Sequence, residues 1–160
     1  IKTIWYETGE VYEETHYKNG KEDGLENSWY QSGKKKGEVR YENGKIEGVV
    51  KTWYENGEVE WEIHYKNGKQ EGMKTQWWWD TGEKWSEVFF RNGVEEGLYT
   101  VWYPNGNKLS ERFYVNGLLE GLETLWDKDG EKDKEVIWKN GEQTDLELGD
   151  VMELRKLSFE

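Results

Sequence analysis

Short runs of alternating apolar and polar residues fill most of the chain, and glycine-containing turns separate them. One such segment, residues 53–76, reads WYENGEVEWEIHYKNGKQEGMKTQ. Apolar and polar residues alternate from Val59 to Tyr65, which is typical of a half-buried β-strand. Asn56-Gly57 before the run predicts a two-residue hairpin turn with both residues at positive φ, and Asn67-Gly68 predicts a second turn after it. The segment therefore predicts two antiparallel strands.

This segment is one of six related copies. The copies begin at tryptophans spaced 24, 24, 25, 24 and 24 residues apart, namely Trp5, Trp29, Trp53, Trp78, Trp102 and Trp126. In five of the six units a glycine four residues after the second Asn-Gly turn, such as Gly72, is expected to relax a longer loop; the sixth unit has Asp145 there. Six units predict a meander of about twelve strands in which each unit packs only on its neighbours. The predicted fold is all-β: an elongated single-layer antiparallel meander of six 24-residue β-hairpin repeats over residues 1–145. Residues 146–160 are predicted to form a C-terminal cap or tail.

Two columns of side chains follow from this periodicity. An aromatic ladder is expected on one face of the sheet, at Tyr17, Tyr41, Tyr65, Phe90, Tyr114 and Trp138. A glutamate column is expected on the opposite face, at Glu14, Glu38, Glu62, Glu87, Glu111 and Glu135. Its members should lie about 9–10 Å apart, because equivalent residues are separated by two strand spacings. We interpret the column as architectural, with each carboxylate bound to a nearby lysine or loop. The alternative is an acidic stripe that binds a basic partner.

The fourth unit is one residue longer than the others and contains Trp77-Trp78-Trp79. Alignment on the turn glycine assigns Trp78 and Trp79 to the ordinary aromatic pair of the repeat. The extra residue then falls in the preceding strand and predicts a β-bulge there, with Trp77 as the unusual side chain. Bulges bend sheets, but they also occur beside functional sites, so a structural and a binding interpretation both remain open.

The face opposite the ladder is predicted to change character along the chain. In the first three units it carries mainly polar residues: Tyr12, His16, Lys36, Arg40, Glu60 and His64. The same positions in the next two units are apolar: Trp85, Phe89, Leu109 and Phe113. Such a patch is usually covered. We expect the tail to cover it, with a short helix over residues 151–157; a partner protein is the alternative.

Composition limits the functions that this chain can have. The net charge is −12, which disfavours nucleic acid and anionic membranes and favours a basic protein partner. No apolar run is long enough for a membrane-spanning helix. The absence of cysteine excludes disulfides and thiolate metal sites, and it fits a reducing, cytoplasmic compartment. The first residue is Ile1, so a trimmed leader and a secreted or cell-surface location remain open.

The residues that could carry chemistry are sparse. His16 and His64 occupy equivalent positions two units apart, roughly 19 Å in the sheet, which is too far to share a metal ion. A catalytic triad is excluded on similar grounds, and a solvated glutamate column lacks the pocket that separates the pKa values of two catalytic carboxyls. The expectation is a protein without catalytic residues, metal or cofactor.

The motif W-Y-x-x-G followed by Y-x-N-G-x-x-x-G resembles the MORN repeat, and it is most similar to the variant found in bacterial antitoxin-type proteins. The resemblance implies a non-enzymatic protein-binding module, monomeric or weakly self-associating, with an antitoxin or immunity role against a basic toxin. A structural or cell-surface spacer, and carbohydrate binding through exposed aromatics, are the alternatives. The candidate binding residues are Trp77, Trp79, Trp85, Phe89, Leu109, Phe113, Glu62, Glu87 and Glu111.

Overall fold

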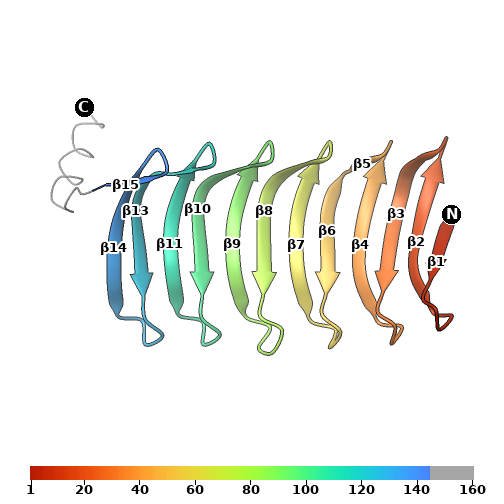
Figure 1. Cartoon of the computed structure of the whole chain (residues 1–160), viewed down its shortest axis with the longest axis horizontal. Coiled ribbons are helices and arrows are strands. Elements are labelled where there is room, and N and C mark those ends of the chain that lie inside the picture. The colour runs from red at the N-terminus through yellow and green to blue at the C-terminus, as the bar shows by residue number, and fades with distance from the viewer. Residues whose placement is uncertain (145–160) are drawn as a thin grey trace.

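The computed structural model describes residues 1–144, which form one open antiparallel sheet in a single layer (Figure 1). Thirteen strands follow one another in meander order, and the two short strands β5 and β12 pair with β4 and β11. The strands are β1 (Lys2–Trp5), β2 (Val11–Lys18), β3 (Lys21–Trp29), β4 (Lys35–Glu42), β5 (Lys45–Ile46), β6 (Gly48–Trp53), β7 (Val59–Lys66), β8 (Lys69–Trp77), β9 (Lys84–Arg91), β10 (Val94–Trp102), β11 (Lys108–Val115), β12 (Leu118–Leu119), β13 (Gly121–Trp126), β14 (Lys132–Lys139) and β15 (Glu142–Thr144). The predicted fold class is confirmed. The predicted cap lies outside the described residues.

Two kinds of turn alternate along the ribbon. At Asn67-Gly68 both residues have positive φ, 53° and 80°, as a two-residue type I′ turn requires, and the other units repeat this turn. At Asn56-Gly57 only the glycine has positive φ, so the prediction of a two-residue turn there is wrong. Instead Gly57 N–H donates to the Tyr54 carbonyl and Tyr54 N–H donates to the Glu58 carbonyl. These two bonds share Tyr54 and enclose a wider turn, in which Gly57 is the residue of a glycine bulge.

The glycine that follows each Asn-Gly turn lies inside a strand rather than in the longer loop that the sequence predicts. Gly72 has a φ of +113° in the middle of β8, and the pairing of β7 with β8 shifts register beside it. At Gly48 and Gly121 the same feature separates β5 from β6 and β12 from β13. These glycines are bulges that increase the local twist of the ribbon.

Replacing Gly72 by alanine is expected to destabilise the sheet by about 2–3 kcal/mol, because an L-residue is strained at this φ and the new Cβ would lie 3.1 Å from the His64 Cβ. Gly97 is the matched control: its φ is +83° and no atom lies within 4 Å of an added Cβ, so Gly97→Ala should cost about 1 kcal/mol. Urea denaturation of both variants measures the difference. Equal losses would show that the close approach to the His64 Cβ adds nothing to the cost.

Side-chain hydrogen bonds tie each unit to the next. The hydroxyl of Tyr30 donates to the Trp53 carbonyl at 2.7 Å, and Tyr6, Tyr54 and Tyr103 make the corresponding bond to the following unit. The ladder aromatics lie on alternate strands, and a residue of the intervening strand lies beside each of them, as Glu95 pairs with Phe90. Within residues 1–144, no two ladder rings stack directly.

A single layer buries few large side chains. In the described residues the buried apolar side chains are those of Val88, Phe90, Val136 and Ile137. Small polar residues are buried beside them, including Ser86, Thr100 and Ser110. Stability therefore depends on contacts between neighbouring strands rather than on a thick core.

The carboxyl group of Glu26 on β3 has a pKa above its ordinary value, because burial disfavours its charge and Glu13 adds repulsion, while a hydrogen bond from Thr15 acts in the opposite direction. Its ionisation therefore opposes folding, and this cost is absent at low pH and develops as pH rises through the glutamate range. We expect Glu26→Gln to raise the midpoint of thermal unfolding at pH 7 and to leave it unchanged near pH 3. Glu58→Gln, at an exposed position, controls for net charge. A gain of equal size at both pH values would contradict this assignment.

Candidate functional site

The two faces of the sheet have different surfaces, because successive side chains of a strand alternate between them. One face, here the Tyr face, carries the ladder aromatics. The other, here the Glu face, carries the glutamate column. Phe90 and Tyr114 line a groove on the Tyr face, and Glu87, Phe89 and Phe113 line another on the Glu face. Each face must therefore be considered separately as a binding surface.

The glutamate column is largely neutralised within the chain. Glu38, Glu87, Glu111 and Glu135 each contact the lysine three residues earlier in the same strand. In the third unit valine replaces that lysine, and Lys51 of β6 contacts Glu62 at 3.0 Å instead. These contacts agree with the architectural interpretation of the column.

Threonines separate the carboxylates along the C-terminal half of the column. Thr75 pairs with both Glu62 and Glu87, and Thr100 pairs with both Glu87 and Glu111. Both threonines are buried. Strands with glutamate thus alternate with strands carrying a small residue, which keeps like charges two strands apart and limits their repulsion.

The three tryptophans occupy different positions from those predicted. Trp77 ends β8 and pairs with Lys84, just as Trp53 ends β6 and pairs with Val59. The indole of Trp78 donates to the Trp102 carbonyl at 3.3 Å, which is the bond that a tyrosine hydroxyl makes in other units. Trp79 lies in the turn and is 62% exposed.

The extra residue of the fourth unit therefore lies in the turn, and the predicted additional bulge in β8 is wrong. The carbonyl of Trp79 accepts a hydrogen bond from Asn56, as the Lys128 carbonyl does from Asn105. Thr81 Oγ1 accepts from Glu83 N–H, as Asn56 Oδ1 does from Glu58 N–H. These equivalences leave Asp80 without a counterpart. Trp77 is consequently an ordinary strand residue, and Trp79 is the more accessible side chain.

Deletion of Asp80 is expected to change the unfolding free energy by less than about 1 kcal/mol, because it converts one surface turn into the turn of the other units. Deletion of Thr75, inside β8, should instead prevent cooperative folding, because it would move the following side chains to the opposite face. Circular dichroism and urea denaturation distinguish the two. Loss of folding on deletion of Asp80 would place the insertion in the strand after all.

The four predicted patch residues do not share one face. Trp77 pairs with Lys84 and Gln76 pairs with Ser86, which leaves Trp85 between them as an unpaired bulge residue. Leu109 is the corresponding unpaired residue of β11. Trp85 lies on the Tyr face, where its ring centroid is 5.3 Å from that of Trp78. Phe89 and Phe113 lie on the Glu face. The prediction of one continuous patch is therefore wrong, because the bulge reverses the alternation of side chains.

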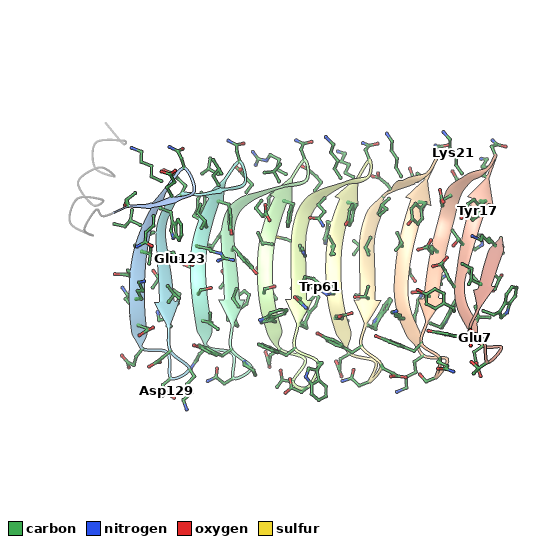
Figure 2. The ribbon with its side chains drawn as sticks, in the orientation of Figure 1. Glu7, Tyr17, Lys21, Trp61, Glu123 and Asp129 are labelled. Carbon is green, nitrogen blue, oxygen red and sulfur yellow. The ribbon has the colours of Figure 1, made fainter. Side chains whose placement is uncertain are left out.

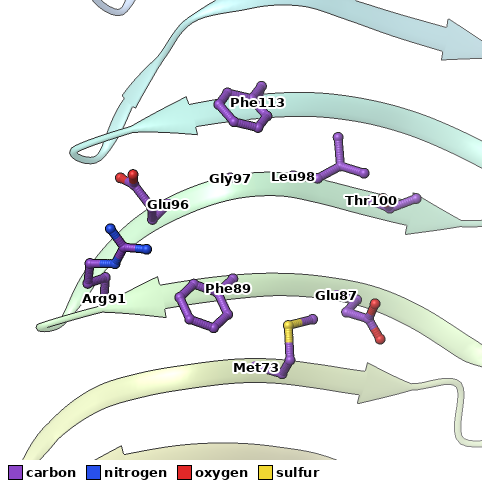
Figure 3. Close-up of a pocket in the computed structure, with 9 residues that line it drawn as sticks. All are labelled: Met73, Glu87, Phe89, Arg91, Glu96, Gly97, Leu98, Thr100 and Phe113. Carbon is purple, nitrogen blue, oxygen red and sulfur yellow. The ribbon is translucent and has the colours of Figure 1, made fainter.

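Phe89 and Phe113 do form an apolar surface, but with two residues that the sequence analysis missed. Met73 pairs with Phe89 across β8 and β9, and Leu98 pairs with Phe113 across β10 and β11. These four residues, here the apolar groove, line a hollow of about 430 Å³ together with Glu87, Arg91, Glu96, Gly97 and Thr100 (Figure 3). Leu98 is 49% and Phe113 is 44% exposed. The available signal was an apolar residue directly after the bulge glycine, seen at Leu25, Val49, Met73, Leu98 and Leu122.

Other candidate chemistry is limited in the described part of the chain. His16 Nδ1 lies 2.7 Å from the Leu25 carbonyl, and His64 Nε2 lies 3.8 Å from a Glu62 carboxylate oxygen. Residues 1–144 contain no group of three or more side chains arranged to hold a metal ion. They also contain no helix with the length and apolar character needed to cross a membrane.

The fold and its grooves define a β-hairpin repeat protein with an exposed surface on each face of one sheet. The family description MORN repeat variant matches residues 1–19, 22–43, 46–67 and 95–116, which together make up more than half of the chain. The chain belongs to the MORN repeat variant family, whose repeats are generally non-catalytic modules. The three tryptophans lie between two of these matched segments, 46–67 and 95–116. No curated protein matches the chain.

Proposed function

We propose that this chain is a non-enzymatic protein-binding module whose apolar groove binds a basic partner, and that the partner is a toxin which the chain neutralises. The observation that carries the proposal is the exposure of Leu98 and Phe113 beside Phe89 and Met73 on a solvated sheet face. Single exposed apolar residues are ordinary, but a contiguous group around a hollow is typical of an interaction site.

The charge of the chain supports a basic partner. Two carboxylates and one cation line the apolar groove: Glu87 lies toward the wide turns, and Glu96, which accepts a hydrogen bond from Asn116 N–H, lies toward the tight turns with Arg91. Lys84 neutralises Glu87 locally, so the attraction comes mainly from the net charge of −12 on the whole chain. Such a field accelerates association with a basic protein and repels acidic competitors.

The antitoxin role rests on the resemblance of the repeat to antitoxin-type MORN variants together with this charge. A toxin that attacks nucleic acid is basic, because it must bind a polyanion. An acidic ribbon that covers such a surface would block substrate binding without any catalysis of its own. In this role the apolar groove contacts the toxin, and the negative charge of the rest of the chain accelerates its association with the toxin.

Capture from the native host tests the proposal. The wild-type chain should retain one basic protein in low salt, and Phe113→Asp should lose it while keeping its folded circular dichroism spectrum. The retained protein should inhibit growth when expressed alone and become harmless when expressed with the wild-type chain. A captured protein that is acidic, or that binds Phe113→Asp equally well, would contradict the proposal.

A further inference from the structure

The Tyr face contains a second groove, on the opposite side of the sheet from the proposed protein-binding surface. It crosses β7 to β11 and has a volume of about 510 Å³, within the range of small-molecule sites. Aromatic rings of Trp61, Phe90 and Tyr99 line it, and Gln76 and Ser86 contribute buried polar groups. Figure 2 labels Trp61 near one end of this region and Glu123 beyond the other. We call it the cationic groove because of the two residues described next.

Lys74 and Arg112 both lie in this groove, and aromatic rings hold both of them. The Lys74 Nζ lies 4.6 Å from the centroid of Trp61 and 5.9 Å from that of Phe90. The Arg112 guanidinium lies 4.5 Å from the centroid of Tyr99 and 5.8 Å from that of Tyr114. Cation–π contacts fix the positions of charged groups that would otherwise move freely in solvent. Lys74 on β8 and Arg112 on β11 lie at the two sides of the groove, three strands and roughly 14 Å apart at the backbone, with Val88 of β9 and Tyr99 of β10 paired between them.

Neither cation has a full set of partners within residues 1–144. Lys74 has no carboxylate within 4 Å there, whereas the lysines of the glutamate column each contact one. Arg112 has a single carboxylate contact, to Glu123 at 3.7 Å, and its buried Nε has no hydrogen-bond partner. The other oxygen of Glu123 is occupied by the Trp138 indole at 2.8 Å. An arginine carries five donors, so most of the hydrogen-bonding capacity of Arg112 remains unused.

We propose that the cationic groove binds a small hydroxylated monocarboxylate, of the sugar-acid class, with its carboxylate on Arg112 and its hydroxyl groups extending along the groove toward Lys74. Charge-assisted hydrogen bonds to a preorganised guanidinium are among the strongest that a protein offers. The net charge of −12 selects against ligands with several negative charges, which excludes polyanions and favours a single carboxylate. Glu95, Gln76 and Ser86 also line the groove and supply the groups that would bind hydroxyls.

The groove differs from the corresponding surface of the other units. The row that contains Lys74 and Arg112 holds Val39, Val50 and Ile63 in the second and third units, and Thr15 and Glu26 in the first. Likewise, Trp61 is a large residue at a position where the second, fourth and fifth units carry the small residues Gly37, Ser86 and Ser110. An architectural role would be repeated from unit to unit, but this combination occurs once in residues 1–144. The inference is independent of the proposed toxin partner, because the two surfaces lie on opposite faces.

Titration with sodium glucuronate, followed by NMR of the Trp61 and Trp85 indole N–H signals, tests the proposal. We expect saturable shifts with a millimolar Kd, and at least a tenfold weaker Kd for Lys74→Gln and for Arg112→Gln. Arg112 also packs on Tyr99, so Arg112→Gln could fail to fold for a reason unrelated to the ligand. Lys74→Gln is therefore included as a second test. Lys84→Gln, on the Glu face, should bind like the wild type.

Matched probes decide between the possible outcomes. Glucose lacks the carboxylate, and acetate lacks the hydroxyls, so neither should saturate the sites over the same concentration range. Equal binding of glucose would overturn the role of Arg112 as the carboxylate-binding group. Equal binding of acetate would reduce the groove to a simple anion site, and absence of any shift with glucuronate would remove the proposal altogether.

Discussion

Phe90→Ala is expected to reduce the unfolding free energy by about 3–4 kcal/mol, which is the largest effect of any substitution considered for this sheet. Phe90 is only 7% exposed, and it lies at the centre of the ladder between Lys74 on one side and Glu95 on the other. In a ribbon of this kind each unit is stabilised by its neighbours, so a central cavity weakens the coupling between the two halves. Urea denaturation should show a lower midpoint and a broader transition.

Tyr17→Ala is the matched control for Phe90→Ala, because Tyr17 occupies the same ladder position in the first unit but is 40% exposed. Its loss should cost about 1 kcal/mol, since less buried area disappears. Equal losses for the two variants would contradict the view that stability is concentrated at the centre of the ribbon.

Leu98→Asp is expected to weaken binding of the captured partner at least 100-fold, because a carboxylate would lie in the centre of the apolar groove where the partner's apolar side chains are expected. The half-exposed position means that the chain itself should remain folded. Titration calorimetry with the purified partner measures the change, and the affinity of the wild type should also fall as salt is raised.

Leu118→Asp separates a local effect from a general one. Leu118 is as exposed as Leu98, at 49%, and the substitution adds the same charge outside the apolar groove. It should leave the affinity within about threefold of wild type, because rim charges change the association rate more than the bound state. A similar loss for both variants would mean that added negative charge alone prevents binding, or that the partner contacts another surface.

The repeat and the sheet could be predicted from the sequence because both are local. Asn67-Gly68 and its counterparts determine the tight turns, and the alternation from Val59 to Tyr65 determines which side chains share a face. Glu87 and Phe89 were placed on the correct face for this reason.

The errors arose where one residue interrupts the alternation. Trp85 is an unpaired bulge residue, so it lies on the Tyr face and not on the face that simple alternation assigns to it, and Leu109 is unpaired at the same place in β11. The triple tryptophan was aligned one position too late, because alignment on the turn glycine assumes that all the wide turns have the same length. The extra residue lies inside the turn between Trp78 and Gly82, and the alternation of apolar and polar residues gives no signal there.

The cationic groove could not be derived from local pattern, because Lys74 and Arg112 lie on strands that are not adjacent. Comparison of equivalent positions does contain a signal at Arg112, which occupies the position that Val39, Ile63 and Val88 hold in the three preceding units. Only the register of the sheet shows that Lys74 and Arg112 lie on one face.

Photo-crosslinking in the native host tests the central claim most directly. A photo-reactive phenylalanine analogue would be placed at position 113, on the Glu face, and in a separate variant at position 114, on the Tyr face. A protein that binds through the apolar groove should form a crosslink to a basic partner from position 113 and none from position 114. Crosslinking to that partner from position 114 alone would place the interface on the Tyr face and contradict the proposed function.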